Sequence, residues 1–240
     1  MITDIVDVNR ISSEAVGGGA APPHTRWVVR DSARRLDETD RFDAFLHECE
    51  SCDPESLAQF VALPPSSRPD IIDRLQAAQT AGACRLVRLC PGAEGHGYPL
   101  SDWLLSPLPE VAARLSLSLA IDYGDAATPP PWNDIYRFVR TYPDLAIVLL
   151  GISLDADLAY AAVLDAAPNV LVDTSRAGDS GCVAQVVRRF GNHRVVLGSG
   201  NGEGVTFEAL TEVLDATELP AVTRTNATAL QAGTWCEEYL

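Results

Sequence analysis

The residues of this chain that could do chemistry lie at the ends of short apolar runs or in the loops that follow them. Three of them suit acid–base catalysis: the imidazole of His96, the carboxylate of Asp122 and the guanidinium of Arg88. Other polar side chains at the ends of such runs suit ligand binding, namely Asn9, Asp173, Arg176, Ser199 and Asn201. If the runs are neighbouring parallel strands, these residues meet at one rim of the sheet.

Arg88 carries the most information among these residues. Side-chain alternation places Leu86 and Arg88 on one side of the strand and Arg85 and Val87 on the other, so one of the two arginines should point into the barrel. An inward guanidinium needs a carboxylate partner, which Asp122 or Asp173 can supply. We predict an ion pair between Arg88 and Asp122. Two interpretations stay open, a pocket for an organic anion and a structural ion pair. The remaining hydrogen bonds are expected from Asn9 and Ser199.

Two other features give weaker signals. His96 lies in the Gly-rich loop Pro91–Pro99, where it is either a general acid or base on a lid or an exposed loop histidine. Cys49 and Cys52 form a CxxC motif without a second pair, which is a weak sign of a metal or redox site.

The elements that must position these residues alternate between strand and helix. Apolar runs predict eight strands: Asp4–Val8, Ala44–His47, Gln59–Leu63, Arg85–Cys90, Ser118–Tyr123, Ala146–Leu150, Val170–Thr174 and Arg194–Gly198. Helical periodicity predicts six helices: Pro69–Thr80, Asp134–Thr141, Ala156–Ala166, Ser180–Phe190, Thr206–Leu214 and Pro220–Leu230. This alternation predicts one α/β domain, a (β/α)8 TIM barrel over residues 1–240. The segment Cys49–Leu57 is short for a helix, so the barrel is expected to be trimmed there, and Ser13–Pro23 is expected to be a flexible loop.

Composition excludes several classes of function. The 240 residues carry a net charge of −15, and all 18 basic residues are Arg. So acidic a chain repels nucleic acids and anionic membranes, and the lack of Lys removes Schiff-base and P-loop chemistry. The N-terminus has no basic region before an apolar stretch, so no signal peptide is expected, and six sparse cysteines fit a cytoplasmic protein.

Four segments in the second half of the chain, in this order, resemble the amidohydrolase-related (amidohydrolase 2) family. They are Tyr142-Pro-Asp-Leu-Ala-Ile-Val-Leu-Leu, Pro168-Asn-Val-Leu-Val-Asp-Thr-Ser, Phe190-Gly-Asn-His-Arg-Val-Val-Leu-Gly-Ser and Asn226-Ala. The resemblance implies a (β/α)8 barrel with a divalent metal ion at the carboxyl ends of the strands. It also implies the ligands of that ion: His-x-His after strand 1, a His on each of strands 5 and 6, and an Asp on strand 8.

This chain departs from the family at every one of those ligand positions. The residues that stand there are Asn9, Ile11, Asp122, Gly151 and Gly200. Neutral side chains cannot replace imidazoles and a carboxylate, so we expect no metal ligands and no cofactor. A divalent ion at Asp122 is the remaining alternative.

Three functions follow from this departure. The first is a metal-free, amidohydrolase-like barrel, a pseudoenzyme candidate, that binds a small organic anion at its mouth. The second is an active hydrolase or lyase with a rebuilt site that uses His96, Asp122 and Arg88. The third is a non-catalytic subunit that supports a partner protein, and a homo-oligomer is also open.

Overall fold

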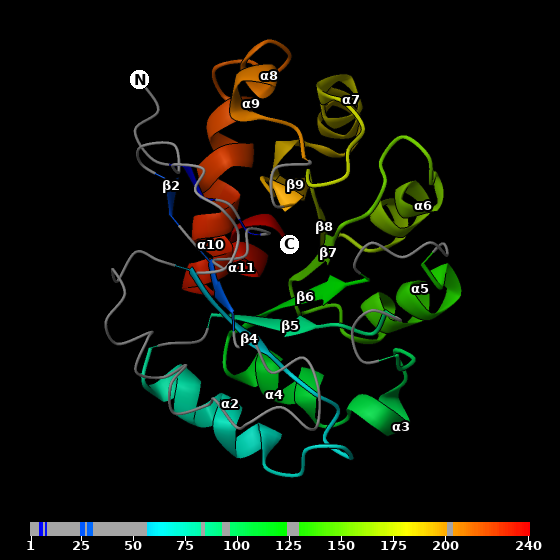
Figure 1. Cartoon of the computed structure of the whole chain (residues 1–240), viewed down its shortest axis with the longest axis vertical. Coiled ribbons are helices and arrows are strands. Elements are labelled where there is room, and N and C mark those ends of the chain that lie inside the picture. Colours follow the sequence, from blue (N-terminus) through cyan, green and yellow to red (C-terminus); the bar gives the residue numbers. More distant parts are fainter. Residues whose placement is uncertain are drawn as a thin grey trace, which may run out of the picture.

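The computed structural model describes residues 5–6, 8, 25–26, 28–30, 57–82, 85–92, 97–123, 130–200 and 204–240. Their strands form a parallel barrel surrounded by helices (Figure 1). The strands are β1 (Ile5–Val6), β2 (Thr25–Arg26), β3 (Val28–Arg30), β4 (Leu57–Val61), β5 (Leu86–Leu89), β6 (Ser118–Asp122), β7 (Ile147–Leu150), β8 (Val170–Asp173) and β9 (Val195–Val196).

The strand order closes into a ring of eight positions. β1 pairs in parallel with β2, and β3 to β9 form a seven-stranded parallel sheet in chain order. β2 and β3 are one residue apart in the chain and together take the second position. The Val8 N–H donates to the Leu197 carbonyl at 2.9 Å, which joins the two ends of the ring. This arrangement confirms the predicted (β/α)8 barrel.

Helices follow the strands on the outside of the barrel (Figure 1). They are α2 (Ile71–Thr80), α3 (Asp102–Leu105), α4 (Leu108–Arg114), α5 (Trp132–Thr141), α6 (Ala159–Ala166), α7 (Ser180–Phe190), α8 (Phe207–Thr211), α9 (Glu218–Pro220), α10 (Asn226–Ala232) and α11 (Trp235–Tyr239). A 3-10 turn, η1 (Asn192–Arg194), precedes β9, and a π-helical turn, η3 (Ala221–Thr225), joins α9 to α10. None of the helices in these ranges is long and apolar enough to cross a membrane.

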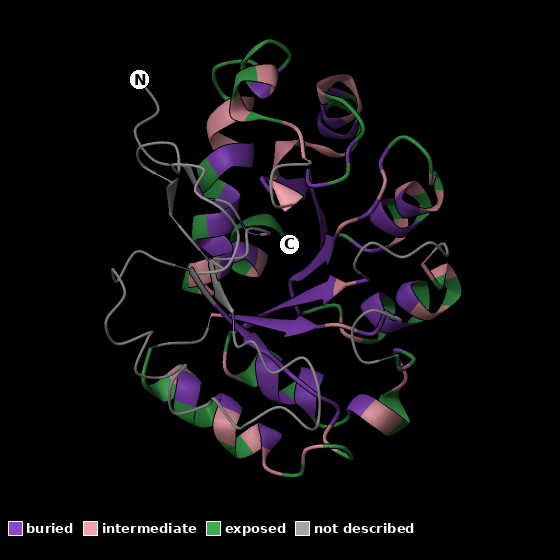
Figure 2. Ribbon diagram, viewed as in Figure 1, coloured by how far each residue is buried: buried purple, intermediate pink, exposed green. Residues whose placement is uncertain are grey.

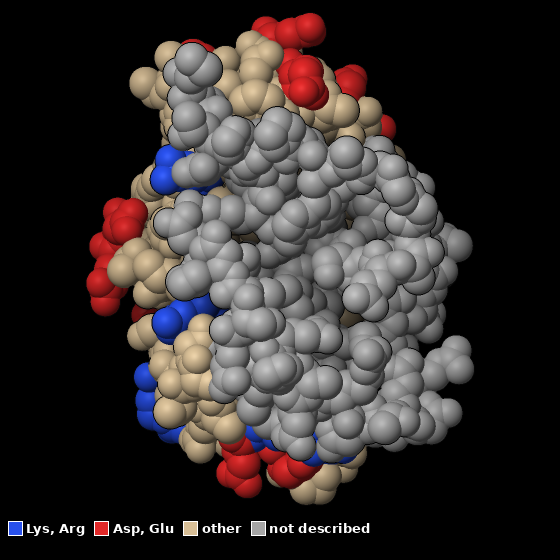
Figure 3. Space-filling model, turned by 60° about the vertical axis from the view of Figure 1, so that its left-hand side comes forward, with Lys and Arg blue, Asp and Glu red and all other residues tan. Residues whose placement is uncertain are grey.

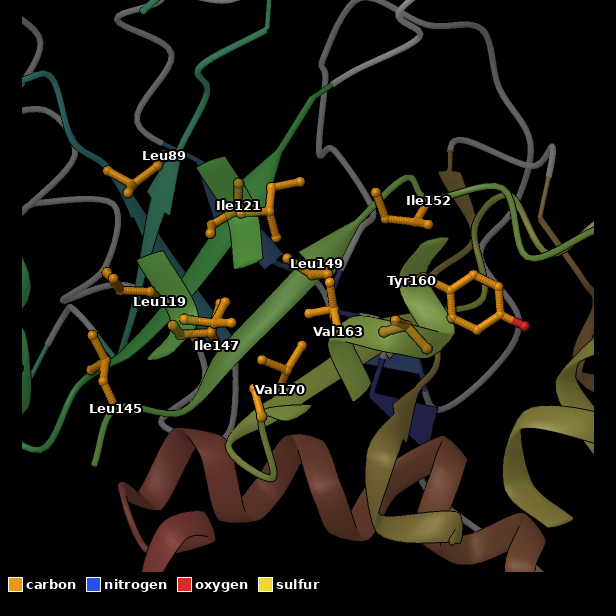
Figure 4. Packing of buried hydrophobic residues seen from close by; sticks show 14 of the residues in the cluster. Leu89, Leu119, Ile121, Leu145, Ile147, Leu149, Ile152, Tyr160, Val163 and Val170 are labelled. Atoms are coloured by element: carbon orange, nitrogen blue, oxygen red, sulfur yellow. The ribbon is translucent and has the colours of Figure 1, made fainter. Parts of the chain in front are cut away.

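Alternation along the strands separates two apolar layers. Val87 and Leu89 of β5 belong to the layer between the sheet and the helices, whereas Leu86 belongs to the barrel interior. Figure 4 shows the outer layer, in which strand side chains such as Leu149 pack near Val163 of α6. Both faces of the strands are therefore buried, as Figure 2 shows, which explains their continuous apolar runs.

The C-terminal helices help to close the amino end of the barrel. Leu230 and Trp235 belong to the interior cluster, and the Ser118 hydroxyl at the start of β6 donates to the Leu230 carbonyl at 3.3 Å. The opposite end, where the strands finish, therefore remains as the mouth for a site.

One predicted strand was wrong. The second position of the barrel is filled by β2 and β3, whereas we expected Ala44–His47 there. Residues 44–47 lie outside the described residues. The segment that forms β3 contains the β-branched pair Val28 and Val29, which suits a strand better than Phe45 and Leu46. The expected loop 13–23 and the trimmed segment 49–56 also lie outside the described part of the chain.

Candidate functional site

The carboxyl ends of β4, β5 and β6 bring three polar side chains together inside the barrel. Arg88 of β5 is 1% exposed and reaches Asp122 at the end of β6. Its Nε donates to Asp122 Oδ2 at 3.0 Å, and its Nη2 donates to the same oxygen. The structure thus confirms the predicted ion pair between Arg88 and Asp122.

Gln59 of β4 is the third member of this network, and the sequence reasoning missed it. Arg88 Nη1 donates to Gln59 Oε1 at 3.0 Å, and Gln59 Nε2 donates to the Val8 carbonyl at 2.6 Å. The hydrogen bonds therefore run from the Val8 carbonyl through Gln59 and Arg88 to Asp122. A polar residue at the inward position of a buried strand was the available signal, since a buried amide needs partners.

The local sequence makes room for the guanidinium. Arg88 lies beside Ala120 in the register of β5 and β6, and Ala120 also faces the interior. The small Ala120 side chain lets the arginine extend along the barrel to Asp122, two residues further on. Within the pair, Asp122 keeps 14% of its side chain exposed and Arg88 only 1%. The carboxylate is thus the part of the pair that lies nearer to solvent.

Asp173 is a second carboxylate at the strand ends. It is the last residue of β8 and is 0% exposed. Its Oδ1 accepts a hydrogen bond from the Gly151 N–H at 2.9 Å, so it leans toward the end of β7. Asp122 lies beside Leu150 in the register of β6 and β7, and Asp173 follows Val172, which lies beside Leu149 in the register of β7 and β8. The strands β5, β6 and β8 therefore carry one guanidinium and two carboxylates near their carboxyl ends, from Arg88, Asp122 and Asp173.

The loops after β8 and β9 pack tightly against each other. The Thr174 hydroxyl donates to the Gly198 carbonyl and accepts from the Gly198 N–H, both at 3.0 Å. Gly200 has φ +54°, and a Cβ there would lie 3.0 Å from the Ser175 Cβ. Glycine is favoured at this position because the backbone is left-handed and the space is filled.

The other predicted site residues divide into two groups. Arg176 is exposed on the loop after β8, and Ser199 is half-buried after β9. The ligand-binding roles of both residues stay predictions. His96, Asn9 and Asn201 lie outside the described residues, as do Cys49 and Cys52.

The described residues do not fit the divalent metal ion that the family resemblance implies. No group of three or more His, Cys, Asp or Glu side chains in the described ranges could hold a metal ion. Asp122 stands at one of the implied ligand positions, yet its Oδ2 receives two donors from Arg88. Gly200 stands at another, where the packing against Ser175 opposes a carboxylate side chain. At the implied metal position, the described side chains therefore form the ion pair of Arg88 and Asp122.

Comparison with known proteins supports the fold. No family model matches the chain, and no curated protein matches it. An uncharacterized TIM-barrel protein from Bordetella bronchiseptica superposes with a TM-score of 0.65 at 17% identity, over 87% of this chain and 78% of that one. A 2,6-dihydroxybenzoate decarboxylase from Rhizobium gives a TM-score of 0.62 at 14% identity, over 96% and 99% of the two chains.

A dihydroorotase from Campylobacter jejuni gives a TM-score of 0.59 at 14% identity, over 85% of this chain and 75% of that one. Other solved structures similar to this chain include a 2,6-dihydroxybenzoate decarboxylase in complex with 2,6-dihydroxybenzoate and a protein from Staphylococcus aureus described as an amidohydrolase. At these identities the likeness concerns the fold, so function has to be argued from the site.

Proposed function

We propose that this protein is an amidohydrolase-like barrel that works without a resident divalent ion and binds a small organic anion at its mouth. The observation that carries the proposal is the ion pair of Arg88 with Asp122 at the carboxyl ends of β5 and β6. Active sites of this fold lie at that end of the strands. The Arg88 guanidinium supplies a positive charge there, which Asp122 neutralises in the unliganded protein.

An organic carboxylate is the ligand class that a guanidinium at this place favours. The planar guanidinium matches a carboxylate in two-pronged hydrogen bonding. In the unliganded protein Asp122 already holds Arg88, so a ligand carboxylate has to compete with Asp122. The protein should therefore bind organic acids weakly, and loss of the Asp122 charge should strengthen the binding.

This competition can be measured directly. Protein dialysed against EDTA is titrated with small mono- and dicarboxylic acids and followed by thermal shift and calorimetry. Asp122→Asn should tighten the binding of the best acid by about tenfold, equivalent to about 1.4 kcal/mol. Asp165→Asn is the matched control, because Asp165 forms an exposed ion pair with Arg189 on the outer helices. Equal affinities in wild type and Asp122→Asn, or binding of organic cations only, would contradict the proposal.

The second candidate is a hydrolase or lyase with a rebuilt site, and the fully buried Asp173 favours it. Asp173 lies at the carboxyl end of β8, where a carboxyl group can exchange a proton with a bound substrate. Here Asp173 would transfer a proton while Arg88 holds the substrate, with His96 and Asp122 as further acid–base groups. Turnover of an organic acid that disappears in Asp173→Asn, with binding retained, would support this candidate. Equal turnover by the variant would exclude Asp173 from the reaction.

A further inference from the structure

The Arg88 guanidinium lies where oxygen atoms from two strands converge inside the barrel. Asp122 Oδ2 accepts from its Nε and Nη2, and Gln59 Oε1 accepts from its Nη1 at 3.0 Å. Gln59 is itself held in this orientation, since its Nε2 donates to the Val8 carbonyl at 2.6 Å. The Gln59 amide therefore presents its carbonyl oxygen, not its N–H group, toward the positive charge.

Carboxylate and amide carbonyl oxygens are also the donors that bind hard divalent cations such as Mn²⁺, Mg²⁺ and Ca²⁺. Here two such oxygens, from Asp122 and Gln59, contact the guanidinium of Arg88, a cation that belongs to the chain itself. Arg88 and Gln59 are 1% and 0% exposed, so the guanidinium is enclosed by protein. A divalent ion at this place would overlap with the guanidinium and would be repelled by its positive charge.

We infer that the Arg88 guanidinium is a built-in cation that occupies the cation position of the mouth and keeps divalent ions out of it. The inference rests on the proposed function. It explains by one residue, Arg88, why the protein works without a divalent ion. Removal of the guanidinium leaves the oxygens of Asp122 and Gln59 without their cation. A divalent ion together with water can then take its place, because a partly buried carboxylate without a partner recruits a counter-charge.

The test uses the full chain and Mn²⁺ as the probe. Arg88→Met removes the charge and keeps much of the apolar stem, and Arg88→Gln removes the charge and keeps a polar end. We expect each variant to bind Mn²⁺ at least tenfold more tightly than wild type, by calorimetry, and to melt at a higher temperature with Mn²⁺ present. Asp122→Asn added to Arg88→Met should abolish the gain, because the carboxylate is the principal ligand.

The matched control is Arg189→Met, which breaks the Arg189–Asp165 ion pair on the protein surface. This variant should gain no Mn²⁺ affinity, since both partners are more than half exposed and Asp165 stays solvated. If Arg88→Met does not fold, Arg88→Gln carries the same measurement. Arg88 variants with Mn²⁺ affinity no greater than that of Arg189→Met would overturn the inference and leave the organic-acid titration untouched. Tight Mn²⁺ binding by wild type would overturn both proposals.

Discussion

At the scale of single residues, the ion pair of Arg88 and Asp122 is so little exposed that each charge needs the other to compensate the cost of its burial. Burying a charge is costly unless a partner compensates it, so loss of one partner costs more than loss of both. Arg88 was predictable because alternation fixes which side of a strand a residue faces, and Asp122 was the nearest strand-end carboxylate. Gln59 was missed because the sequence reasoning looked for charged residues at the ends of strands, and Gln59 is a neutral amide inside one.

Arg88→Leu should destabilise the protein by about 3 kcal/mol, because it leaves the Asp122 carboxylate near the interior without its cation. The 14% exposure of Asp122 places this value at the lower end of the range for buried pairs. Adding Asp122→Leu should restore a large part of the loss. Urea unfolding of wild type, both single variants and the double variant gives the coupling energy. A loss below about 1 kcal/mol for Arg88→Leu would mean that the pair is effectively solvated.

At the scale of elements, the sheet from β4 to β9 and most of the outer helices were predictable. Their signals were continuous apolar runs for doubly buried strands and helical periodicity for α2, α5, α6 and α7. The second strand was misplaced because short runs of similar hydropathy compete and only pairing with neighbouring strands distinguishes them. The short helices α3, α4 and α11 were missed, since four to seven residues give too few turns for a periodic signal.

Arg194 connects helix α6 with strand β8. It is 6% exposed, and it donates to the carbonyls of Val170, Ala167 and Leu164 at the end of α6 and the start of β8. Burial lowers the pKa of Arg194 to about 10, so the side chain remains charged at neutral pH. Arg194→Leu should cost about 2–4 kcal/mol, because buried carbonyls lose charged donors. The control is Arg188→Leu, which alters an exposed arginine of α7. In the same unfolding experiment it should lower the free energy of unfolding by only about 0.5 kcal/mol, as an ordinary surface change does.

His193 gives α11 a pH-dependent contribution to stability. Its ring stacks on Tyr239 with centroids 5.1 Å apart, and burial, followed by the nearby Arg194 charge, lowers the pKa of His193 below its ordinary 6.5. Below pH 6.5 the unfolded chain then binds a proton more readily than the folded protein. Stability should fall as pH decreases from 6.5 toward the folded-state pKa. His193→Gln should remove this part of the slope, and parallel stability curves for the two proteins between pH 7 and 5 would refute the assignment.

At the scale of the whole molecule, the fold and the charge distribution agree with a small-molecule role. In the described part of the surface in Figure 3, arginine and acidic side chains are interspersed, and the chain as a whole carries a net charge of −15. A nucleic-acid-binding protein needs a basic surface, which an acidic chain of this kind opposes.

Under our proposal the protein binds its ligand without a divalent ion, because Arg88 occupies the cation position. The most direct measurement is elemental analysis of wild-type protein purified without chelators, followed by the organic-acid titration before and after dialysis against EDTA. We predict far less than one zinc, manganese or iron per chain and equal acid affinity in both titrations. One firmly bound zinc or manganese per chain, with acid binding lost on its removal, would contradict the claim.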